Sequence, residues 1–383
     1  MVPASARLLR RLRAVVLLAL LSAVGAAAAA AGSTSPRATG EGSLHLLEWP
    51  AYSDASFARA FQRQTGCKIV RKDVGSSNQM VALMQNGGHK KYDLVSASGD
   101  IALALVQAHD VKPIDVAAIP SEKDVFPALR SPRFNTVRGI HYGVAVQWVP
   151  NLLLYDTKSV TPAPSSWRVI YAYPHRITLP NDPLQIADAA LYLQKARPSL
   201  RVRDPYELTR TQFDAALKLL ESQKSRVSSY WNYAADEIAA FKDGTAVVGP
   251  GWPYQALTLK TQKFPVASVI PREGITGFAD SWMLAAAAPH PVCARLWLRY
   301  VLTPSVQAKL AITLGETPVN PKACPLMNAL QPGSCAAYHL DKAAAYLSRT
   351  KFWQTPLAAC GWTATQRCVP LVDWQQAWTQ LRG

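Results

Sequence analysis

Residues Gly274–Leu284 read Gly-Ile-Thr-Gly-Phe-Ala-Asp-Ser-Trp-Met-Leu, an apolar run that carries one ring and one carboxylate near its start. The run predicts a buried β-strand, in which residues i and i+2 point to the same side. Phe278 and Asp280 should therefore face one common space. A ring beside a carboxylate suits an organic ammonium ion, because the π-face attracts the charge and the carboxylate accepts its N–H donors. The alternative is a core phenylalanine next to an aspartate that caps a turn.

The segments that open the folded part predict a doubly wound α/β lobe. Short apolar strands over 43–49, 67–74 and 92–96 alternate with amphipathic helices over 56–66, 78–86 and 101–109. In such sheets ligands bind beyond the carboxyl ends of the strands. Trp49, Tyr52, Ser98 and Asp100 follow strand ends and are expected there, although Ser98 and Asp100 also suit helix caps.

A second lobe is predicted after the apolar run Gly143–Tyr155, which is broken by Pro150 and is suited to cross from one lobe to the other. We expect strands at 176–179, 245–248 and 266–270, helices around 183–193, 211–222 and 233–241, and a strand-end loop at Gly249–Trp252. The strand at 274–284 then returns to the first lobe. The predicted division is lobe I over 44–147 and 280–323, and lobe II over 148–279 and 324–383 with the C-terminal segment.

The first 32 residues predict a secretory signal peptide. Four arginines precede an apolar run that is too short to span a membrane, and an alanine-rich end follows. Residues 33–43 are rich in Gly, Ser, Thr and Pro, which is typical of a flexible leader. No Cys lies near the expected cleavage point, so we expect a periplasmic protein without a lipid anchor.

The chain is basic, with a formal net charge of +16, and removal of the four signal arginines would leave 16 − 4 = +12. A basic surface is compatible with nucleic acid or membrane partners. The Lys and Arg residues are scattered, however, and no nucleic-acid motif accompanies them. We therefore expect ordinary solvated surface charge and no nucleic-acid partner.

Six Cys in an exported chain predict disulfides. Cys324 with Cys335, and Cys360 with Cys368, would each close a short loop, whereas Cys67 and Cys293 either pair with each other or stay free. A zinc site is the competing interpretation, but there is no CxxC motif and the seven His are dispersed. We expect no metal and no cofactor.

Catalytic signatures are missing from the sequence. It contains no Gly-x-Ser-x-Gly, no His-Glu-x-x-His and no phosphate-binding loop. We therefore expect a binding protein and not an enzyme.

Five segments in the same order resemble the extracytoplasmic solute-binding proteins of ATP-driven importers, and among them the spermidine/putrescine-binding periplasmic proteins. These segments are Leu-Glu-Trp-Pro-Ala-Tyr (47–52), Lys-Tyr-Asp-Leu-Val (91–95), Leu-Leu-Leu-Tyr-Asp-Thr-Lys-Ser-Val (152–160), Phe-Ala-Asp-Ser (278–281) and Glu-Thr-Pro-Val-Asn (316–320). The resemblance implies a type II periplasmic-binding-protein fold with a hinge between two lobes. It also implies a monomer that traps a polyamine by closure and delivers it to the permease subunits of an ABC importer.

The resemblance further implies ten ligand-binding residues: Trp49, Tyr52, Ser98, Asp100, Asp182, Gln185, Trp252, Phe278, Asp280 and Gln354. Three of them depart from the family pattern. Gln185 replaces a second acid, Asp100 stands where an aromatic residue is common, and Phe278 replaces a frequent tryptophan. Several also have structural explanations: Trp49 and Trp252 as core residues, Asp182 as a helix cap, and Gln354 as a structural contact.

Two other functions remain open at this point. The basic charge would suit a binding protein for an anion, such as a phosphonate, or for another small solute. The same scaffold could also serve as a surface interaction protein whose pocket is filled by its own side chains. Aromatic and acidic residues at the expected cleft favour a cation over an anion.

Overall fold

The computed structural model describes residues 40–362 and 365–382. The predicted signal peptide (1–32) and residues 33–39 of the predicted leader lie outside the described residues. Within the described part, no helix is long and apolar enough to cross a bilayer.

The first sheet is built around the stretch that carries Phe278 and Asp280. This strand, β13 (Ile275–Ala285), is buried along its whole length and pairs antiparallel with both β7 and β3. In the described residues the sheet has eight strands in the order β14-β7-β13-β3-β1-β2, with β15 and β4 also paired to β13. Their bounds are β1 Ser43–Glu48, β2 Lys68–Asp73, β3 Leu94–Ser98, β4 Val111–Lys112, β7 Gly143–Pro150, β14 Thr317–Pro318 and β15 Thr350–Phe352.

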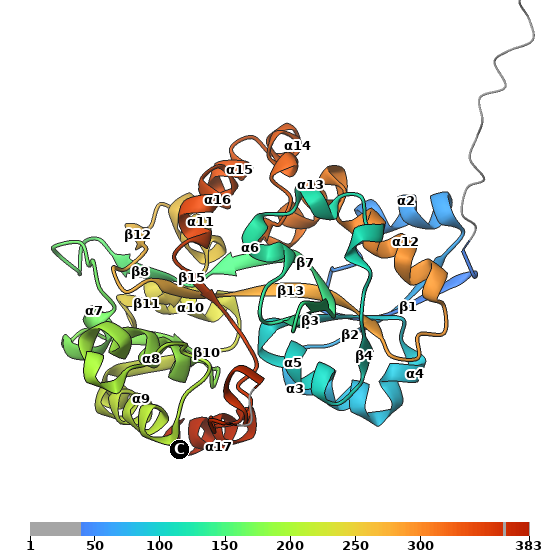
Figure 1. Cartoon of the computed structure of the whole chain (residues 1–383). Helices are drawn as coiled ribbons and strands as arrows, with labels where there is room; N and C mark the ends of the chain where they lie inside the picture. The colour runs from blue at the N-terminus through green and yellow to red at the C-terminus, as the bar shows by residue number, and fades with distance from the viewer. Residues whose placement is uncertain (1–39, 363–364, 383) are drawn as a thin grey trace, which may run out of the picture. The chain divides into compact units, whose positions relative to one another are not determined.

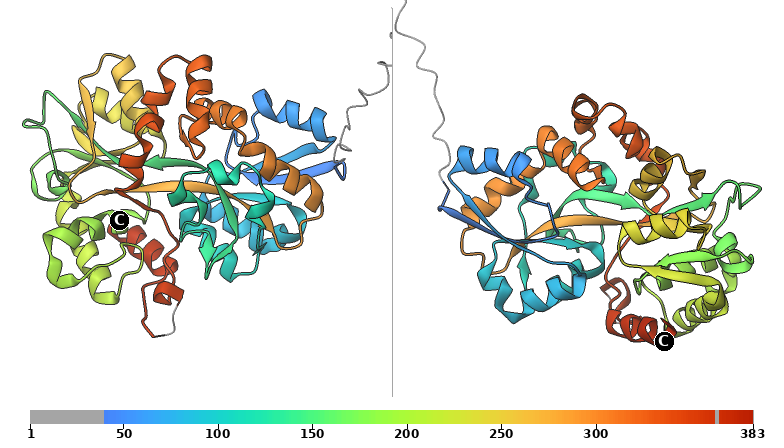
Figure 2. Two further views of the ribbon diagram at one scale, coloured as in Figure 1. Left: turned by 45° about the horizontal axis from the view of Figure 1, so that its top comes forward. Right: turned by 180° about the vertical axis from the view of Figure 1, so that it is seen from behind.

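Helices flank the first sheet (Figures 1 and 2). The first of them begins after Asp54, whose carboxylate accepts the Ser56 N–H at 2.8 Å, and ends at Gly66, which adopts a left-handed φ of 77°. The helices are α2 Ala55–Thr65, α3 Ser77–Leu83, α4 His89–Lys91, α5 Gly99–Gln107, α6 Pro127–Arg130, α12 Pro291–Val301, α13 Pro304–Leu314, α14 Cys324–Leu330, α15 Ser334–Ala337 and α16 Ala343–Leu347. A small hairpin joins β5 Thr136–Val137 to β6 Ile140–His141.

The second sheet has five strands within the described residues, in the order β10-β9-β11-β8-β12. Its strands are β8 Leu152–Asp156, β9 Ile177–Pro180, β10 Val227–Trp231, β11 Val248–Gly251 and β12 Val266–Val269. Its helices are α7 Arg168–Ala172, α8 Gln185–Ala196, α9 Arg210–Gln223, α10 Ala234–Lys242, α11 Pro253–Thr261 and α17 Leu371–Arg382. The C-terminal α17 packs near α9, as both views in Figure 2 show.

The chain crosses between the sheets where the sequence predicts it. β7 belongs to the first sheet and β8 to the second, with Asn151 between them. Asn151 donates its backbone N–H to the Thr276 carbonyl at 2.9 Å and its side-chain amide to the Thr276 hydroxyl at 2.8 Å. The two crossing segments are therefore tied to each other. The residue bounds of the lobes remain a proposal.

One predicted loop is a strand. Gly249–Gly251 continues β11 through the second sheet, whereas the sequence favoured a strand at 245–248 and a loop after it. A Cβ on Gly249 would lie 2.5 Å from the Thr178 carbonyl oxygen, and one on Gly251 would lie 2.5 Å from Glu237 Oε2. These glycines are therefore required by close neighbours and do not mark a turn.

All six Cys form disulfides: Cys67–Cys293, Cys324–Cys335 and Cys360–Cys368. The two short loops are confirmed, and the pairing that the sequence left open is resolved. Cys67 precedes β2 and Cys293 lies on α12, so this disulfide fastens the edge of the first sheet to a helix 226 residues further along the chain.

Candidate functional site

Strand ends of both sheets surround one cavity of about 740 Å³. Residues that follow β1, β3, β9, β10 and β11 line it, together with side chains of β13. This is the edge where ligands bind in open α/β sheets. We call this cavity the cleft, and it is lined by Trp49, Pro50, Tyr52, Gly75, Ser76, Ser77, Asn78, Ser98, Asp100, Pro180, Asn181, Asp182, Pro183, Leu184, Trp231, Asn232, Tyr233, Trp252, Phe278, Asp280, Leu314, Glu316, Trp353, Leu371, Gln375, Trp378 and Thr379.

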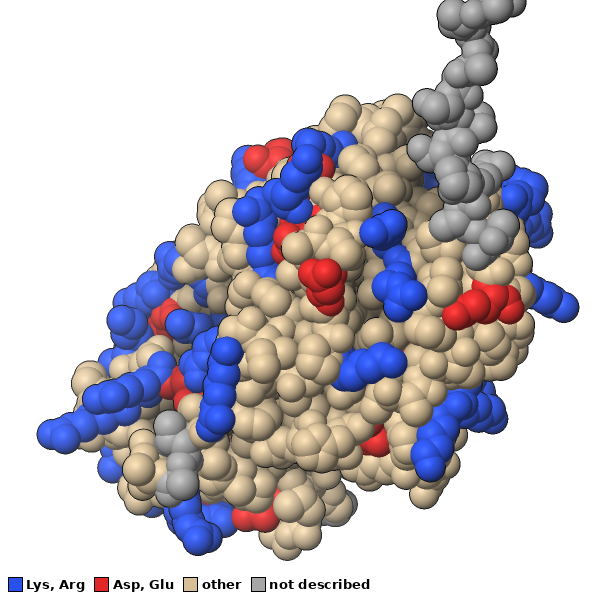
Figure 3. Space-filling model, turned by 45° about the vertical axis from the view of Figure 1, so that its right-hand side comes forward, with Lys and Arg blue, Asp and Glu red and all other residues tan. Residues whose placement is uncertain are grey.

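The charge of the cleft is opposite to that of the chain. Four lining residues are acidic, namely Asp100, Asp182, Asp280 and Glu316, and none of the described lining residues is Lys, Arg or His. On the face in Figure 3, Lys and Arg are spread over the surface with acids among them and do not gather in one patch. The excess positive charge is therefore a property of the outer surface, whereas the charged side chains that line the cleft are acidic.

Asp280 is buried in the cleft and is held by two hydroxyl groups. Tyr52 Oη donates to one carboxylate oxygen and Ser98 Oγ to the other. The strand register brings this about, because Asp280 of β13 lies directly opposite Ser98 of β3. Burial raises the pKa of Asp280 to about 6, while the bonds from Ser98 and Tyr52 oppose the increase. Ser98 makes no side-chain cap bond to α5, so its hydroxyl is committed to Asp280.

Glu316 makes a second acidic neighbour for Tyr52, whose hydroxyl lies 3.2 Å from Glu316 Oε2. A tyrosine hydroxyl has one proton, so it cannot donate to Asp280 and Glu316 at the same time. Burial, reinforced by the charge of Asp280, raises the pKa of Glu316 well above its ordinary value. The three side chains hold more acceptors than donors, and a ligand that brings N–H groups and positive charge would satisfy them.

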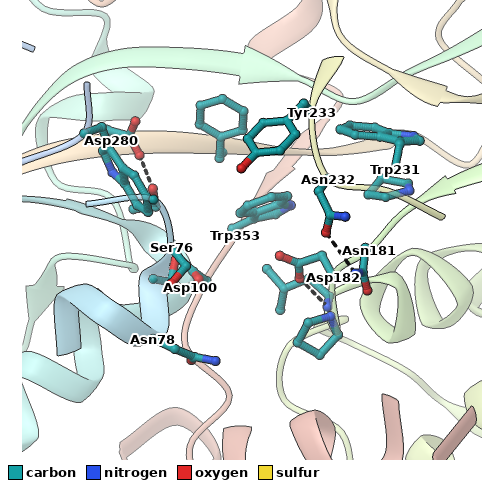
Figure 4. A pocket seen from close by; sticks show the side chains of 18 of the residues that line it. Ser76, Asn78, Asp100, Asn181, Asp182, Trp231, Asn232, Tyr233, Asp280 and Trp353 are labelled. Atoms are coloured by element: carbon teal, nitrogen blue, oxygen red, sulfur yellow. Dashed lines mark hydrogen bonds between the residues drawn. The ribbon is translucent and has the colours of Figure 1, made fainter. Parts of the chain in front are cut away.

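Asp100 and Asp182 form the other acidic part of the cleft. Asp100 Oδ1 is buried and has no hydrogen-bond partner among the described residues. Burial, and next the charge of Asp182, raise the pKa of Asp100 to about 7. Asp182 Oδ1 accepts the Leu184 N–H at 2.7 Å, and burial raises the pKa of Asp182 to about 6. Figure 4 shows Asp100 and Asp280 on one side of the cleft and Asp182 on the other.

Aromatic rings form a continuous wall between these acids. Trp252 meets Trp231 at 5.1 Å and Phe278 at 5.5 Å between ring centroids, and Phe278 meets Trp353 at 5.4 Å. Trp252 Nε1 also donates to Asn151 Oδ1 at 3.0 Å, which connects the wall to the crossing segment. In Figure 4 Trp353 lies between the acids of the two sides. Ring faces beside carboxylates can hold an alkylammonium ion along its length.

Eight of the ten predicted site residues line the cleft, and Gln185 and Gln354 do not. Gln185 is buried and donates to Asp188 Oδ2 at 2.7 Å, while Gln354 Nε2 lies 3.4 Å from Glu207 Oε1. Their contact with a ligand stays a prediction.

Sequence reasoning missed several residues of the lining. Glu316 lies in a segment that carried the family resemblance but received no role. Trp353 is the chain neighbour of the predicted Gln354. Neighbours in extended chain face opposite sides, but alternation alone does not say which of the two faces the cleft. Trp231 is the last residue of β10, a strand that was not predicted, and Tyr233 lies just after it.

Known proteins share the sequence pattern and the fold of this chain. The model of a family described as bacterial extracellular solute-binding protein matches residues 56–330. The chain is 22% identical over 300 residues to the spermidine/putrescine-binding periplasmic protein of Salmonella typhimurium, which covers 78% of this chain and 83% of that protein. It is 25% identical over 317 residues to a putrescine-binding periplasmic protein of Escherichia coli, with coverage of 78% and 83%.

A solved structure shows the fold. A putative spermidine/putrescine ABC transporter protein from Listeria monocytogenes superposes with a TM-score of 0.69 at 17% identity, over 89% of this chain and 99% of that one. The predicted fold class, a two-lobed type II periplasmic-binding-protein fold, is confirmed.

Proposed function

Because the chain belongs to the bacterial extracellular solute-binding proteins, we propose that it captures a polyamine between its lobes and delivers it to the permease of an ABC importer in the periplasm. One observation carries the proposal: the cleft of a chain with net charge +16 is lined by four carboxylates, with rings between them and no basic residue in the described lining. The names of the spermidine- and putrescine-binding relatives support the same ligand class.

The two acidic parts of the cleft suit the two ends of a diamine. One ammonium group would bind between Asp280 and Glu316, and the other between Asp100 and Asp182, with the methylene chain against Trp353 and Phe278. Asp100 lies just after a strand of the first sheet and Asp182 just after a strand of the second, and the two carboxylates repel each other when both are ionised. A cation between them removes that repulsion, so the ligand favours the closed form. The hinge would be the crossing at Asn151 and Thr276, and binding involves no chemistry on the ligand.

Thermal unfolding tests the ligand class most simply. A ligand that binds only the folded protein stabilises it by about 2.7 kcal/mol at a concentration one hundred times Kd. We expect putrescine or spermidine to raise the melting temperature, and phosphate, phosphonates and neutral amino acids to leave it unchanged. Stabilisation by the anions alone would contradict the proposal.

Affinity should fall as the pH is lowered. Asp182 and Asp280 have pKa values of about 6 and Asp100 of about 7, whereas alkylammonium groups stay charged throughout this range. If binding requires the ionised form, protonation between pH 8 and pH 5 weakens it roughly tenfold for each carboxylate with a pKa of about 6, and roughly a hundredfold for Asp100 with its pKa of about 7. Calorimetry at both pH values should show this loss, with proton release on binding near pH 6. An affinity that does not vary with pH would exclude these acids as ligands.

The free protein should show the opposite dependence. Its buried carboxyls have pKa values above those of the unfolded chain, so the protonated forms favour folding. This stability is fully present below about pH 4 and is lost as the pH rises through 6 to 7. Without ligand, these groups should therefore make the protein more stable at pH 5 than at pH 8.

A further inference from the structure

A cluster of metal-ligand side chains lies outside the cleft, at the start of α12. His45 of β1, Asp93 before β3 and His290 each offer one ligand atom, and these atoms lie within 4.8 Å of one another. The two imidazole rings are 4.8 Å apart between centroids. This group could not be predicted from the sequence, because strand pairing and the docking of α12 bring the three residues together.

Hydrogen bonds fix which ring nitrogen is available on each histidine. His290 Nδ1 lies 3.1 Å from Asp93 Oδ2, and His45 Nδ1 lies 3.2 Å from the Lys91 carbonyl oxygen. Both partners are acceptors, so each neutral ring carries its proton on Nδ1 and leaves a lone pair on Nε2. Neither Nε2 has a hydrogen-bond partner within the described part of the chain. A carboxylate and a carbonyl behind two imidazoles form the outer shell that metal-binding histidines use.

Asp93 supplies the countercharge and is held firmly. Its carboxylate is fully buried and accepts two backbone N–H groups, that of His45 at 2.7 Å and that of His290 at 2.5 Å. Glu41 Oε2 accepts the Val292 N–H at 2.8 Å in the first turn of α12. These two acids offset the positive end of the helix dipole, which would otherwise oppose a cation. The His290 side chain is 23% exposed, so an ion can reach the site from solvent.

We propose that His45 and His290 bind one divalent transition-metal ion, with Zn²⁺ and Cu²⁺ as the class that imidazole ligands favour. Asp93 positions His290 and balances the charge, and water completes the coordination. The ion would join β1 to α12 beside the Cys67–Cys293 disulfide, so its role is structural. The proposal is independent of the ligand assigned to the cleft.

Titration calorimetry tests the site on the full chain without a histidine tag, after metal is removed with EDTA. Addition of ZnCl₂ should show one ion per chain with a micromolar Kd, and a hundredfold excess over Kd should raise the melting temperature by about 4 °C. His45→Ala and His290→Ala should each weaken Zn²⁺ binding at least tenfold, because either change removes a ligand.

The matched control is His175→Ala, which alters a histidine of the second lobe and should leave Zn²⁺ binding unchanged. Each variant should melt like the wild type without metal, and each should bind putrescine like the wild type. Absence of Zn²⁺ binding to the wild type, or equal binding in the His45→Ala/His290→Ala double variant, would overturn the proposal.

Discussion

Asp280→Asn should weaken putrescine binding about a hundredfold and leave the free protein folded. The change removes the charge but keeps the shape, so an ammonium ion loses its carboxylate partner in a desolvated site, which costs about 3 kcal/mol. The free protein should melt at the same temperature or higher at pH 8, because burial of the ionised carboxylate is unfavourable and raises its pKa to about 6. Calorimetric titration and thermal unfolding measure the two effects separately.

The control for this prediction is Asp214→Asn, which neutralises an exposed acid on α9 that does not line the cleft. It removes the same charge from the chain and should change neither binding nor melting temperature. If Asp280→Asn lowers the melting temperature of the free protein and leaves affinity within threefold, Asp280 is a structural residue.

Removal of the Cys67–Cys293 disulfide should have the largest effect on stability. The bond closes a loop with a sequence separation of 226 residues. On the chain-entropy model its loss lowers the free energy of unfolding by about 5 kcal/mol. The double variant Cys67→Ala/Cys293→Ala, compared with the wild type by denaturant unfolding, should show a correspondingly lower midpoint.

The Cys360–Cys368 bond provides the matched comparison, because its sequence separation is only 8. The same model gives about 2.5 kcal/mol for its loss. The long-range bond should therefore contribute about twice as much as the short one. Equal losses for the two double variants would show that loop closure in the unfolded chain is not the source of the stabilisation.

A helix is predicted well from the sequence when the residues that begin and end it are recognisable there. The helix from Ala55 to Thr65 has its cap at Asp54 and its stop at Gly66, and both are visible in the sequence. Gly249 and Gly251 were misinterpreted because their reason is tertiary: Thr178 and Glu237 approach their backbone too closely for a side chain. Glycine is typical both of a turn and of a strand whose neighbours leave no room for a side chain, so the sequence alone does not distinguish the two.

In the candidate site, too, some residues could be predicted from local sequence patterns, whereas others are brought together only by the tertiary structure. Phe278 and Asp280 could be paired from strand alternation alone, since both lie on one buried run. Glu316 could not be joined to them without knowing that Tyr52 stands between two acids. Trp353 was missed by one position, because the side that each residue of an extended segment faces depends on its pairing with β13.

The proposed function requires a cleft that is specific for organic cations. Titration calorimetry of the ligand-free wild type with putrescine, and with n-butylamine in parallel, tests it most directly. We predict one putrescine per chain with micromolar or tighter affinity, and butylamine at least a hundredfold weaker because it fills only one of the two acidic parts. Equal affinity for both amines, or binding of an anion with no heat from either amine, would show that the cleft does not recognise a diamine by its two ends.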